Sequence, residues 1–354
     1  MKQYIGLISG TSVDGVDAVV VNDDIKLLAH CHLPYPQKLR TQLKQISQTL
    51  SLNLHTLAEI DRAVAALFSE AAVSVLKKAA LNAQDITAIG SHGQTIYHLP
   101  KRYSLQIGHP ALIAEQTGIC VVADFRMNDI AAGGEGAPLM PAFHHFFLNS
   151  TPANVLNLGG IANLTIDDSR RLRAFDTGPA NTLMDNWIET HLNKPYDKQG
   201  HWAKDGLLDI KLLQRLLSDA YFNKKPPKST GVEYFNLNWL NAQLNGNEKP
   251  QDVQRTLLEL SAQSIANCID NTNDIFICGG GVHNDFLIQR IRELCPHNTV
   301  ASTAVLSIHP DYVEAAGFAY LAKKTLLKEP VINITHTNGA RILGGIYYAS
   351  KHSQ

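Results

Sequence analysis

Two segments of the sequence, about 150 residues apart, share one pattern: an apolar run, a glycine-containing turn and a second apolar run. The first covers residues 4–21 with its turn at 9–15, and the second covers 153–166 with its turn beginning at 159–160. Short apolar runs rich in β-branched residues are typical of strands. Each segment therefore predicts a strand, a tight turn and a strand. Duplication of one domain would explain the repeat, and chance repetition is the alternative.

The first turn contains groups that could bind a ligand. It contains two glycines, three hydroxyl side chains and the carboxylate of Asp14. Backbone N–H groups that converge in a glycine-permitted turn form a concavity for anions. Asp14 would repel an anion unless a divalent cation lay between them. The turn thus indicates a phosphate clamp with a metal-facing carboxylate, and a hairpin with favourable turn residues is the alternative.

Composition limits the classes of partner. The 354 residues are 45% apolar and 18% charged, which fits a globular protein of two domains. The net charge of −1 gives no electrostatic reason to expect nucleic acid or an anionic membrane, and no apolar run approaches 18 residues. None of the five cysteines forms a C-x-x-C pair, and Cys120 and Cys278 lie in apolar runs, so we expect buried thiols and a cytoplasmic protein.

Polar residues follow several of the predicted strands. Residues 91–95 and 124–126 each follow an apolar run, at the edge where open α/β sheets bind ligands. Asp176 follows the predicted strand 172–175 and precedes Thr-Gly-Pro. A carboxylate exposed there could take a proton from a sugar hydroxyl or from water. It could also simply cap the turn.

A third glycine turn, Gly279–Gly281, lies between a predicted strand and a helix from about Asp285. It is not the dinucleotide fingerprint, because residue 284 is asparagine, and the chain has no Walker sequence. The histidines show no H-E-x-x-H spacing. His92 lies at a strand end and Glu314 at a helix start, which makes both candidates for a site. The consecutive histidines 144 and 145 are weaker candidates, because their aromatic and apolar neighbours are typical of packing.

Helical spacing of apolar residues predicts a long helix over residues 57–76 and a last helix over about 312–327. The segment 129–138 has three glycines and no periodicity, so we place the domain change near it. The predicted domains are 1–128 and 129–339, and the tail from about 340 to 354 is expected to pack on the first.

Taken together, these motifs resemble the anhydro-N-acetylmuramic acid kinase family. The resemblance runs in order from residue 4 to about 346 and includes Ser9–Gly15, Ser91–Thr95, Asp124–Arg126, Leu156–Asn163, Phe175–Pro179, Pro226–Gly231 and Cys278–Asn284. It implies the sugar kinase/actin superfamily, with two ribonuclease-H-like α/β domains flanking an ATP cleft. It also implies ATP-dependent conversion of 1,6-anhydro-N-acetylmuramic acid to the 6-phosphate during cell-wall recycling, with water opening the anhydro bridge.

The resemblance assigns roles to particular residues and implies ATP and Mg²⁺ as cofactors, an amino sugar as substrate and a possible homodimer. Asp176 becomes the catalytic base, and Asp14 and Asp176 become the residues that face the metal. Nucleotide contacts fall on the three glycine turns: Gly10, Thr11, Ser12, Asp14, Gly15, Asp17, Asn157, Gly159, Gly160, Asn163, Gly279, Gly280, Gly281 and Asn284. Sugar contacts fall on His92, Gln94, Thr95, Asp124, Arg126 and Glu314.

Three positions depart from the pattern of the family. Glu135 stands where a glutamine is expected, Val232 where an arginine is common, and Ala180 where a glycine is usual. Asp176 and the phosphate turns are intact, so the resemblance still implies an active kinase. These departures would act on sugar affinity or on loop geometry.

Two other functions fit part of the pattern. One is another ATP-dependent sugar kinase of the same superfamily, in which no water attacks the substrate. The other is a nucleotide-binding module without catalysis, similar to actin-like or chaperone-like proteins. The presence of Asp176 argues against the second, because a pure switch needs no general base beside a sugar.

Overall fold

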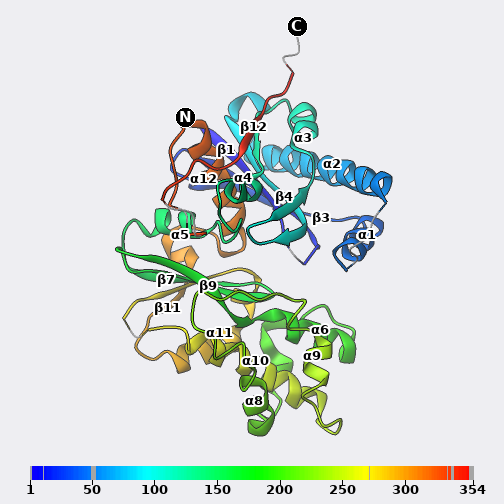
Figure 1. Cartoon of the computed structure of the whole chain (residues 1–354), viewed down its shortest axis with the longest axis vertical. Helices are drawn as coiled ribbons and strands as arrows, with labels where there is room; N and C mark the ends of the chain where they lie inside the picture. Colours follow the sequence, from blue (N-terminus) through cyan, green and yellow to red (C-terminus); the bar gives the residue numbers. More distant parts are fainter. Residues whose placement is uncertain are drawn as a thin grey trace. The chain divides into compact units, whose positions relative to one another are not determined.

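The computed structural model describes residues 2–10, 12–48, 53–270, 272–332, 334–335 and 339–350. The chain forms two compact units (Figure 1). The first contains the residues up to Phe143 together with those from Tyr312 onward, and the second contains His144–Asp311.

The first unit is built on a mixed sheet with the strand order β12-β6-β4-β1-β2-β3, and β5 pairs with β4. β2 is antiparallel to β1 and β3, whereas β4 is parallel to β1 and β6. Figure 1 shows the last strand, coloured red, beside the blue and cyan strands. The strands are β1 (Gln3–Ser9), β2 (Gly15–Asn22), β3 (Leu27–Pro34), β4 (Ala88–Leu99), β5 (Tyr103–Ile107), β6 (Val121–Ala123) and β12 (Gly345–Tyr347).

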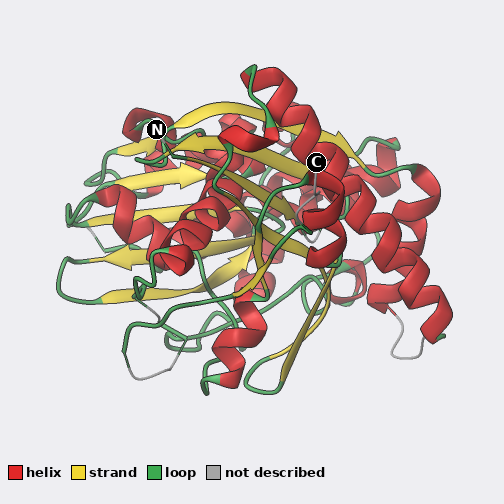
Figure 2. Cartoon of the chain, turned by 90° about the horizontal axis from the view of Figure 1, so that it is seen from above, coloured by secondary structure: helices red, strands yellow, loops and turns green. Residues whose placement is uncertain are grey.

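Helices pack on this sheet, as the red ribbons beside the yellow strands show in Figure 2. The predicted long helix is confirmed as α2. Its first turn is capped by Asn53, whose side chain accepts hydrogen bonds from two backbone N–H groups, and its apolar stripe joins the core beneath the strands. The helices are α1 (Gln37–Gln48), α2 (Leu54–Ala79), α3 (Pro110–Thr117), α4 (Phe125–Ala131), α5 (Pro141–Leu148), at the change between the units, and α12 (Val313–Leu326).

Helix α12 explains why the units differ from the predicted domains, whose limits were 128/129 and 339/340. It packs on β1 and β4 with almost no space between the backbones. A Cβ atom at Gly6 would lie 1.8 Å from the carbonyl oxygen of Ala315, and one at Gly90 would lie 2.0 Å from that of Phe318. Only glycine allows such an approach. The chain therefore returns to the first unit at Tyr312, well before residue 340.

The second unit repeats this arrangement in a five-stranded sheet with the order β11-β10-β7-β8-β9. β8 is antiparallel to β7 and β9, and β10 is parallel to β7 and β11. Both sheets thus have the ribonuclease-H-like order 3-2-1-4-5, with the second strand reversed. The strands are β7 (Ala153–Leu158), β8 (Ile161–Asp167), β9 (Leu172–Pro179), β10 (Ile275–Cys278) and β11 (Val300–Ser302).

The core of the second unit lies between its sheet and the helices after β9. It is a single cluster of buried side chains from both layers, with Phe235 and Leu258 among the fully buried ones. The helices are α6 (Asn181–Leu192), α7 (His201–Lys204), α8 (Ile210–Leu217), α9 (Leu237–Asn241), α10 (Pro250–Ala266) and α11 (Asp285–Leu294). Short 3₁₀ turns cover Ala83–Asp85, Lys198–Gly200, Gly280–His283, Thr303–Leu306 and Pro310–Tyr312.

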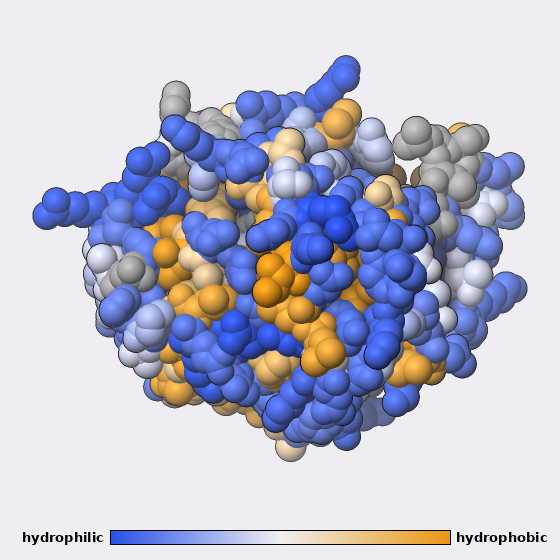
Figure 3. Space-filling view, turned by 90° about the horizontal axis from the view of Figure 1, so that it is seen from below, coloured by the Kyte–Doolittle hydropathy of each residue, from blue (hydrophilic) through white to orange (hydrophobic). Residues whose placement is uncertain are grey.

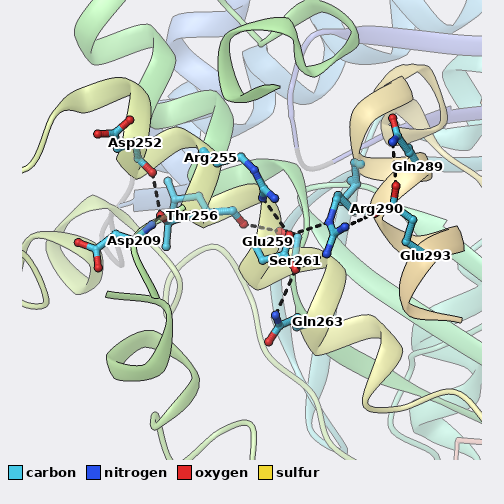
Figure 4. A network of polar contacts seen from close by, with 12 residues as sticks. Asp209, Asp252, Arg255, Thr256, Glu259, Ser261, Gln263, Gln289, Arg290 and Glu293 are labelled. Carbon is cyan, nitrogen blue, oxygen red and sulfur yellow. Dashed lines mark hydrogen bonds and ion pairs between the residues drawn. The ribbon is translucent and has the colours of Figure 1, made fainter. Parts of the chain in front are cut away.

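A buried carboxylate ties α10 to α11 (Figure 4). Glu259 leaves 1% of its side chain exposed and forms ion pairs of 2.9 Å with Arg255, on its own helix, and with Arg290 of α11. Gln263 adds a hydrogen bond of 3.1 Å. Burial alone would raise the pKa of Glu259, but these donors hold it at about 2. The carboxylate is therefore charged and saturated with donors, which makes it a structural group.

Two strand ends were predicted too early. β4 does not end at Gly90 but continues through Leu99, because it forms a hairpin with β5 after its register changes near Gly93. β9 continues through Asp176 to Pro179, because Asp176 still pairs with Asn163 of β8. Residues 91–95 and Asp176 are thus strand residues.

The surface is mostly hydrophilic in the view of Figure 3, with separate apolar patches. In the described part of the chain, no helix has the length and apolar character that crossing a bilayer requires. All five cysteines are free thiols. Cys278 is buried, as predicted, and Cys120 is only partly buried.

Candidate functional site

The turn between β1 and β2 is closed by its own backbone and held from outside. The N–H of Val13 donates to the carbonyl of Gly10 at 3.3 Å, and Val13 has a left-handed φ of 51°. Arg40, which the sequence did not single out, donates from Nε to the carbonyl of Val13 at 2.9 Å. Of the predicted nucleotide contacts here, Thr11 lies outside the described residues.

Asp14 lies at the exposed tip of this turn. Its Oδ1 accepts hydrogen bonds from Ser12 Oγ at 2.8 Å and from the N–H of Gly15 at 3.0 Å. These two bonds fix the carboxylate and use one of its two oxygens. Asp17, on β2, is engaged elsewhere, because its Oδ1 lies 2.8 Å from Nδ1 of His32. That hydrogen bond raises the pKa of His32.

Gln94, one of the predicted sugar contacts, braces the same turn. Its side chain is buried, and its Oε1 accepts a 2.5 Å bond from Ser9 Oγ while its Nε2 lies 3.3 Å from the carbonyl of Gly10. Tyr35 contacts the same Oε1 at 3.4 Å. The amide of Gln94 thus joins the end of β1 to β4.

His92, Arg126 and Glu314 come together from three elements of the first unit. His92 Nδ1 lies 3.0 Å from the carbonyl of Gly93 and so carries the ring proton, which leaves Nε2 to accept the 2.8 Å bond from Arg126 Nε. Burial, with the charge of Arg126, lowers the pKa of His92 well below its usual value. His92 is therefore a neutral acceptor that orients Arg126.

The guanidinium of Arg126 is further fixed by a 2.9 Å bond from its Nη1 to the carbonyl of Gly136. Burial lowers the pKa of Arg126, and the charges of Glu314 and Asp129 oppose that shift. Desolvation raises the pKa of Glu314, at the start of α12, whereas Arg126 lowers it. His92, Arg126 and Glu314 thus influence one another's pKa values and form one electrostatic group.

Two other predicted sugar contacts, Thr95 and Asp124, form their hydrogen bonds with residues outside this group. Thr95 Oγ1 accepts a 3.1 Å bond from Gln106 of β5. Asp124 is exposed, has a left-handed φ of 61° and accepts a hydrogen bond from the hydroxyl of Tyr347. Both side chains therefore already have partners in the first unit.

The carboxylate of Asp176 accepts hydrogen bonds from three donors of the second unit. Its Oδ1 accepts from Asn163, and its Oδ2 accepts 2.9 Å bonds from Ser229 Oγ and from the N–H of Thr230. The hydroxyl of Tyr221 donates to its backbone carbonyl at 2.7 Å. Burial raises the pKa of Asp176 above its usual value, and the donors to its carboxylate counteract that shift. Ser229, Thr230 and Tyr221 were missed as site residues.

Gly159 and Gly160 form the turn between β7 and β8. Asn163, which donates to Asp176, follows this turn in β8. The sequence missed Asn181, whose Nδ2 donates to the carbonyls of Leu158 and Gly159 at 3.0 and 2.8 Å. The first residue of α6 thus holds the loop in shape.

The third glycine turn packs directly on the second. Gly279 has a φ of 81°, and a Cβ atom there would lie 2.3 Å from Oδ1 of Asn157. A Cβ at Gly281 would lie 2.5 Å from that of Leu158. Asn284 caps α11 by accepting the N–H of Leu287 at 3.0 Å. No such contact limits Gly280, and a cavity of about 390 Å³ that includes Ile277, Val282, Ile288 and Ser302 in its lining adjoins this turn.

The three departures from the family pattern have distinct settings. Glu135 lies 3.4 Å from the ammonium of Lys101. Ala180 is fully buried at the start of α6, where its carbonyl accepts the hydroxyl of Ser261 at 3.0 Å. Val232 is exposed.

Comparison with known proteins gives a consistent result over the whole length. Residues 2–349 match the family model described as anhydro-N-acetylmuramic acid kinase. A protein of that name from Coxiella burnetii is 47% identical over 366 aligned positions, covering 99% of this chain and 98% of the relative. One from Nitrosomonas europaea is 41% identical, covering 98% and 99%.

Comparison with solved structures finds only distant similarity. A xylulose kinase from Lactobacillus acidophilus has a TM-score of 0.48 at 12% identity and covers 99% of this chain and 94% of its own. A ROK family glucokinase from Streptomyces griseus, solved with glucose and AMPPNP, has a TM-score of 0.43 at 15% identity, covering 91% and 99%. By its family model and its full-length relatives, the chain belongs to the anhydro-N-acetylmuramic acid kinase family.

Proposed function

We propose that this kinase converts 1,6-anhydro-N-acetylmuramic acid and ATP to N-acetylmuramic acid 6-phosphate in cell-wall recycling, with Asp176 as the general base. Membership of the family supports the substrate and the reaction class. The location would be the cytoplasm, where ATP is available.

The observation that carries the proposal is the setting of Asp176. Its carboxylate is partly buried, has a raised pKa and is held by Asn163, Ser229 and Thr230. A general base works best when its pKa approaches the working pH and its position is fixed. A residue that only capped a turn would not need three donors from two distant segments of the chain.

The glycine turns suit the nucleotide. In the first unit, the turn before β2 offers backbone N–H groups for phosphate oxygens. In the second unit, Gly159–Gly160 and Gly279–Gly281 allow close approach of a ligand to the backbone, and the adjoining cavity would take the nucleoside.

Mg²⁺ fits the residues present. Protein sites for Mg²⁺ commonly supply one or two carboxylates, and waters and phosphate oxygens complete the coordination. Asp14 offers an exposed carboxylate with one oxygen left over by its hydrogen bonds, and Asp176 is the second candidate. The described residues include no group of three or more side chains that could hold a metal ion. Mg²⁺ would neutralise charge on the phosphates.

The substrate dictates what Asp176 must do. The anhydro bridge joins C1 to O6, so O6 carries no proton and cannot attack as a hydroxyl would. Asp176 would take a proton from a water that forms a bond to C1, and the C1–O6 electron pair would move to O6. O6 would then attack the γ-phosphorus in line with ADP as the leaving group. One proton abstraction would serve both bond changes.

In the first unit, Arg126 would bind the carboxylate of the lactyl group, because His92 and Gly136 hold its guanidinium in a fixed orientation. Glu314 would accept a hydroxyl or amide hydrogen of the sugar. Glu135, paired with Lys101, would add little repulsion.

ATP turnover with matched sugars tests the proposal. We expect turnover with 1,6-anhydro-N-acetylmuramic acid and none with N-acetylmuramic acid, whose C1 hydroxyl is already formed. Turnover of N-acetylmuramic acid without turnover of the anhydro sugar would favour an ordinary sugar kinase, and no turnover with any sugar would favour a binding module.

A further inference from the structure

The second unit contains a cavity that none of the roles above uses. It has a volume of about 310 Å³ and lies between the β8–β9 hairpin, the loop 222–228 and the end of α10. The apolar part of its wall includes Ile166, Phe175 and Phe222. No carboxylate is among the lining residues. Most of the polar part of the wall is formed by four cationic side chains: Arg173, Lys224, Lys225 and Lys228.

Among the residues that the structure describes, the charges of these cations are not neutralised by direct ion pairs; only longer-range interactions reach carboxylates, that of Lys224 with Asp219 and that of Arg173 with Asp168. In the described part of the chain, none of the four forms an ion pair with a carboxylate. Lys228 is 8% exposed, although buried lysines are normally paired. Its ammonium lies over the ring of Tyr221 at 4.8 Å, a contact that lowers the cost of burial without neutralising the charge.

Arg173 gives a second, independent observation. Its Nε is buried and has no hydrogen-bond partner. A buried donor without an acceptor costs free energy, so such groups usually mark a missing partner. Here the group belongs to a side chain that lines the cavity.

The cavity is separate from the catalytic side of Asp176. Successive side chains of a strand point to opposite faces of its sheet. Arg173 and Phe175 lie on the face of β9 that lines the cavity. Asp176, the next residue of the strand, points to the opposite face and accepts a hydrogen bond from Asn163. An occupant would therefore not compete for the carboxylate.

We propose that this cavity binds a small phosphate-bearing anion, free phosphate or a phosphomonoester, through Arg173, Lys225 and Lys228. Arginine binds phosphate oxygens with its planar fork, and lysine adds point charges. Four like charges in one cleft raise the local potential, which a dianion would relieve. The volume and the apolar wall leave room for the carbon skeleton of a monoester.

The site would communicate with the base through the backbone. The carbonyl of Lys228 accepts the N–H of Asp176 at 3.0 Å, and the next two residues hold its carboxylate. Binding at the cavity would thus order the segment 228–230.

The test is the thermal midpoint Tm of the full chain in rising inorganic phosphate at pH 7.5, with saturating ADP and Mg²⁺ and with chloride at equal ionic strength as the reference. A ligand of the folded state raises Tm in a saturable way. A second arm measures N-acetylmuramic acid 6-phosphate on the parent and on Lys225→Gln, because this compound is also the proposed product. Tighter binding than phosphate that the variant loses would identify the monoester as the occupant of the cavity. Equal or weaker binding would identify free phosphate.

Matched variants locate the binding. Arg173→Gln and Lys225→Gln should each weaken phosphate binding about tenfold or more, the loss expected for one charge-assisted hydrogen bond. Lys211→Gln, at an exposed lysine of α8, should leave it unchanged. Lys225 is also exposed, so its variant should fold normally. No saturable rise in the parent, or the same rise in the Lys225→Gln and parent proteins, would overturn the proposal.

Discussion

The donors around Asp176 place opposite demands on its carboxyl group. Burial favours the neutral acid, whereas Thr230, Asn163 and Ser229 favour the carboxylate. The net pKa lies above the usual value, which suits a group that takes a proton and later releases it. Activity should accordingly fall as the pH drops through this raised pKa.

Replacing Asp176 by asparagine should preserve binding and remove the proton acceptor. We expect Asp176→Asn to keep its affinity for nucleotide and sugar but to lose about 10²–10⁴-fold in kcat, the usual contribution of a general base. Steady-state kinetics combined with calorimetric binding would check both. Asp168→Asn, in the exposed β8–β9 turn, is the control and should have normal kcat. A near-normal rate in Asp176→Asn would rule out its role as base.

The ring of His92 should stay neutral under working conditions. Its pKa is well below 6.5 because the folded protein buries it beside Arg126. Unfolded chains bind the proton more readily, so the folded state loses stability as the pH falls below about 6.5. Nitrogen NMR should find the Nδ1-protonated tautomer at pH 6. An imidazolium at that pH would contradict the assignment of Nε2 as the acceptor from Arg126.

Some residues of the candidate site could be predicted from local sequence. The glycine turns and Asp176 stand out because their neighbours in the chain form strands. Ser229 and Thr230 could not be found in this way, because they reach Asp176 across 53 and 54 residues through the fold. The contacts of Gln94 with Ser9 and Gly10 could not be predicted either, because they join residues more than 80 positions apart in the sequence.

Elements whose apolar residues recur with a clear helical period were the most predictable. Helix α2 shows a full apolar stripe and a capping asparagine, and both are local signals. The ends of β4 and β9 depend on pairing with partners distant in sequence, so polar residues in them looked like loops.

The contact between α10 and α11 should depend on the charge of Glu259. Removing one partner from a buried ion pair commonly costs about 3–5 kcal/mol, so Glu259→Gln should lower the free energy of unfolding by about 3 kcal/mol. Denaturant titration measures this directly. Glu293→Gln, whose carboxylate is 45% exposed and also contacts Arg290, is the control and should cost less than about 1 kcal/mol.

The same carboxylate predicts a pH dependence. Because its pKa is about 2 in the folded protein and near 4.5 in the unfolded chain, its contribution is complete above about pH 4.5. The contribution is lost as the pH falls from there towards 2. Glu259→Gln should therefore show a flatter acid limb than the parent protein, and parallel limbs would contradict the assigned pKa.

At the scale of the whole molecule, the duplicated strand order was visible as two similar openings in the sequence. The limits of the units were not, because α12 packs on strands more than 200 residues earlier in the chain. The signals that could have revealed this contact are Gly6 and Gly90, whose missing side chains admit the helix.

In the proposed reaction, water opens the anhydro bridge while O6 receives the phosphoryl group. A single turnover in ¹⁸O-labelled water, followed by mass spectrometry of the product, shows where the oxygen of water goes. We expect one ¹⁸O atom on C1 and none in the phosphoryl group. Label in the phosphoryl group, or an unlabelled C1 hydroxyl, would contradict it.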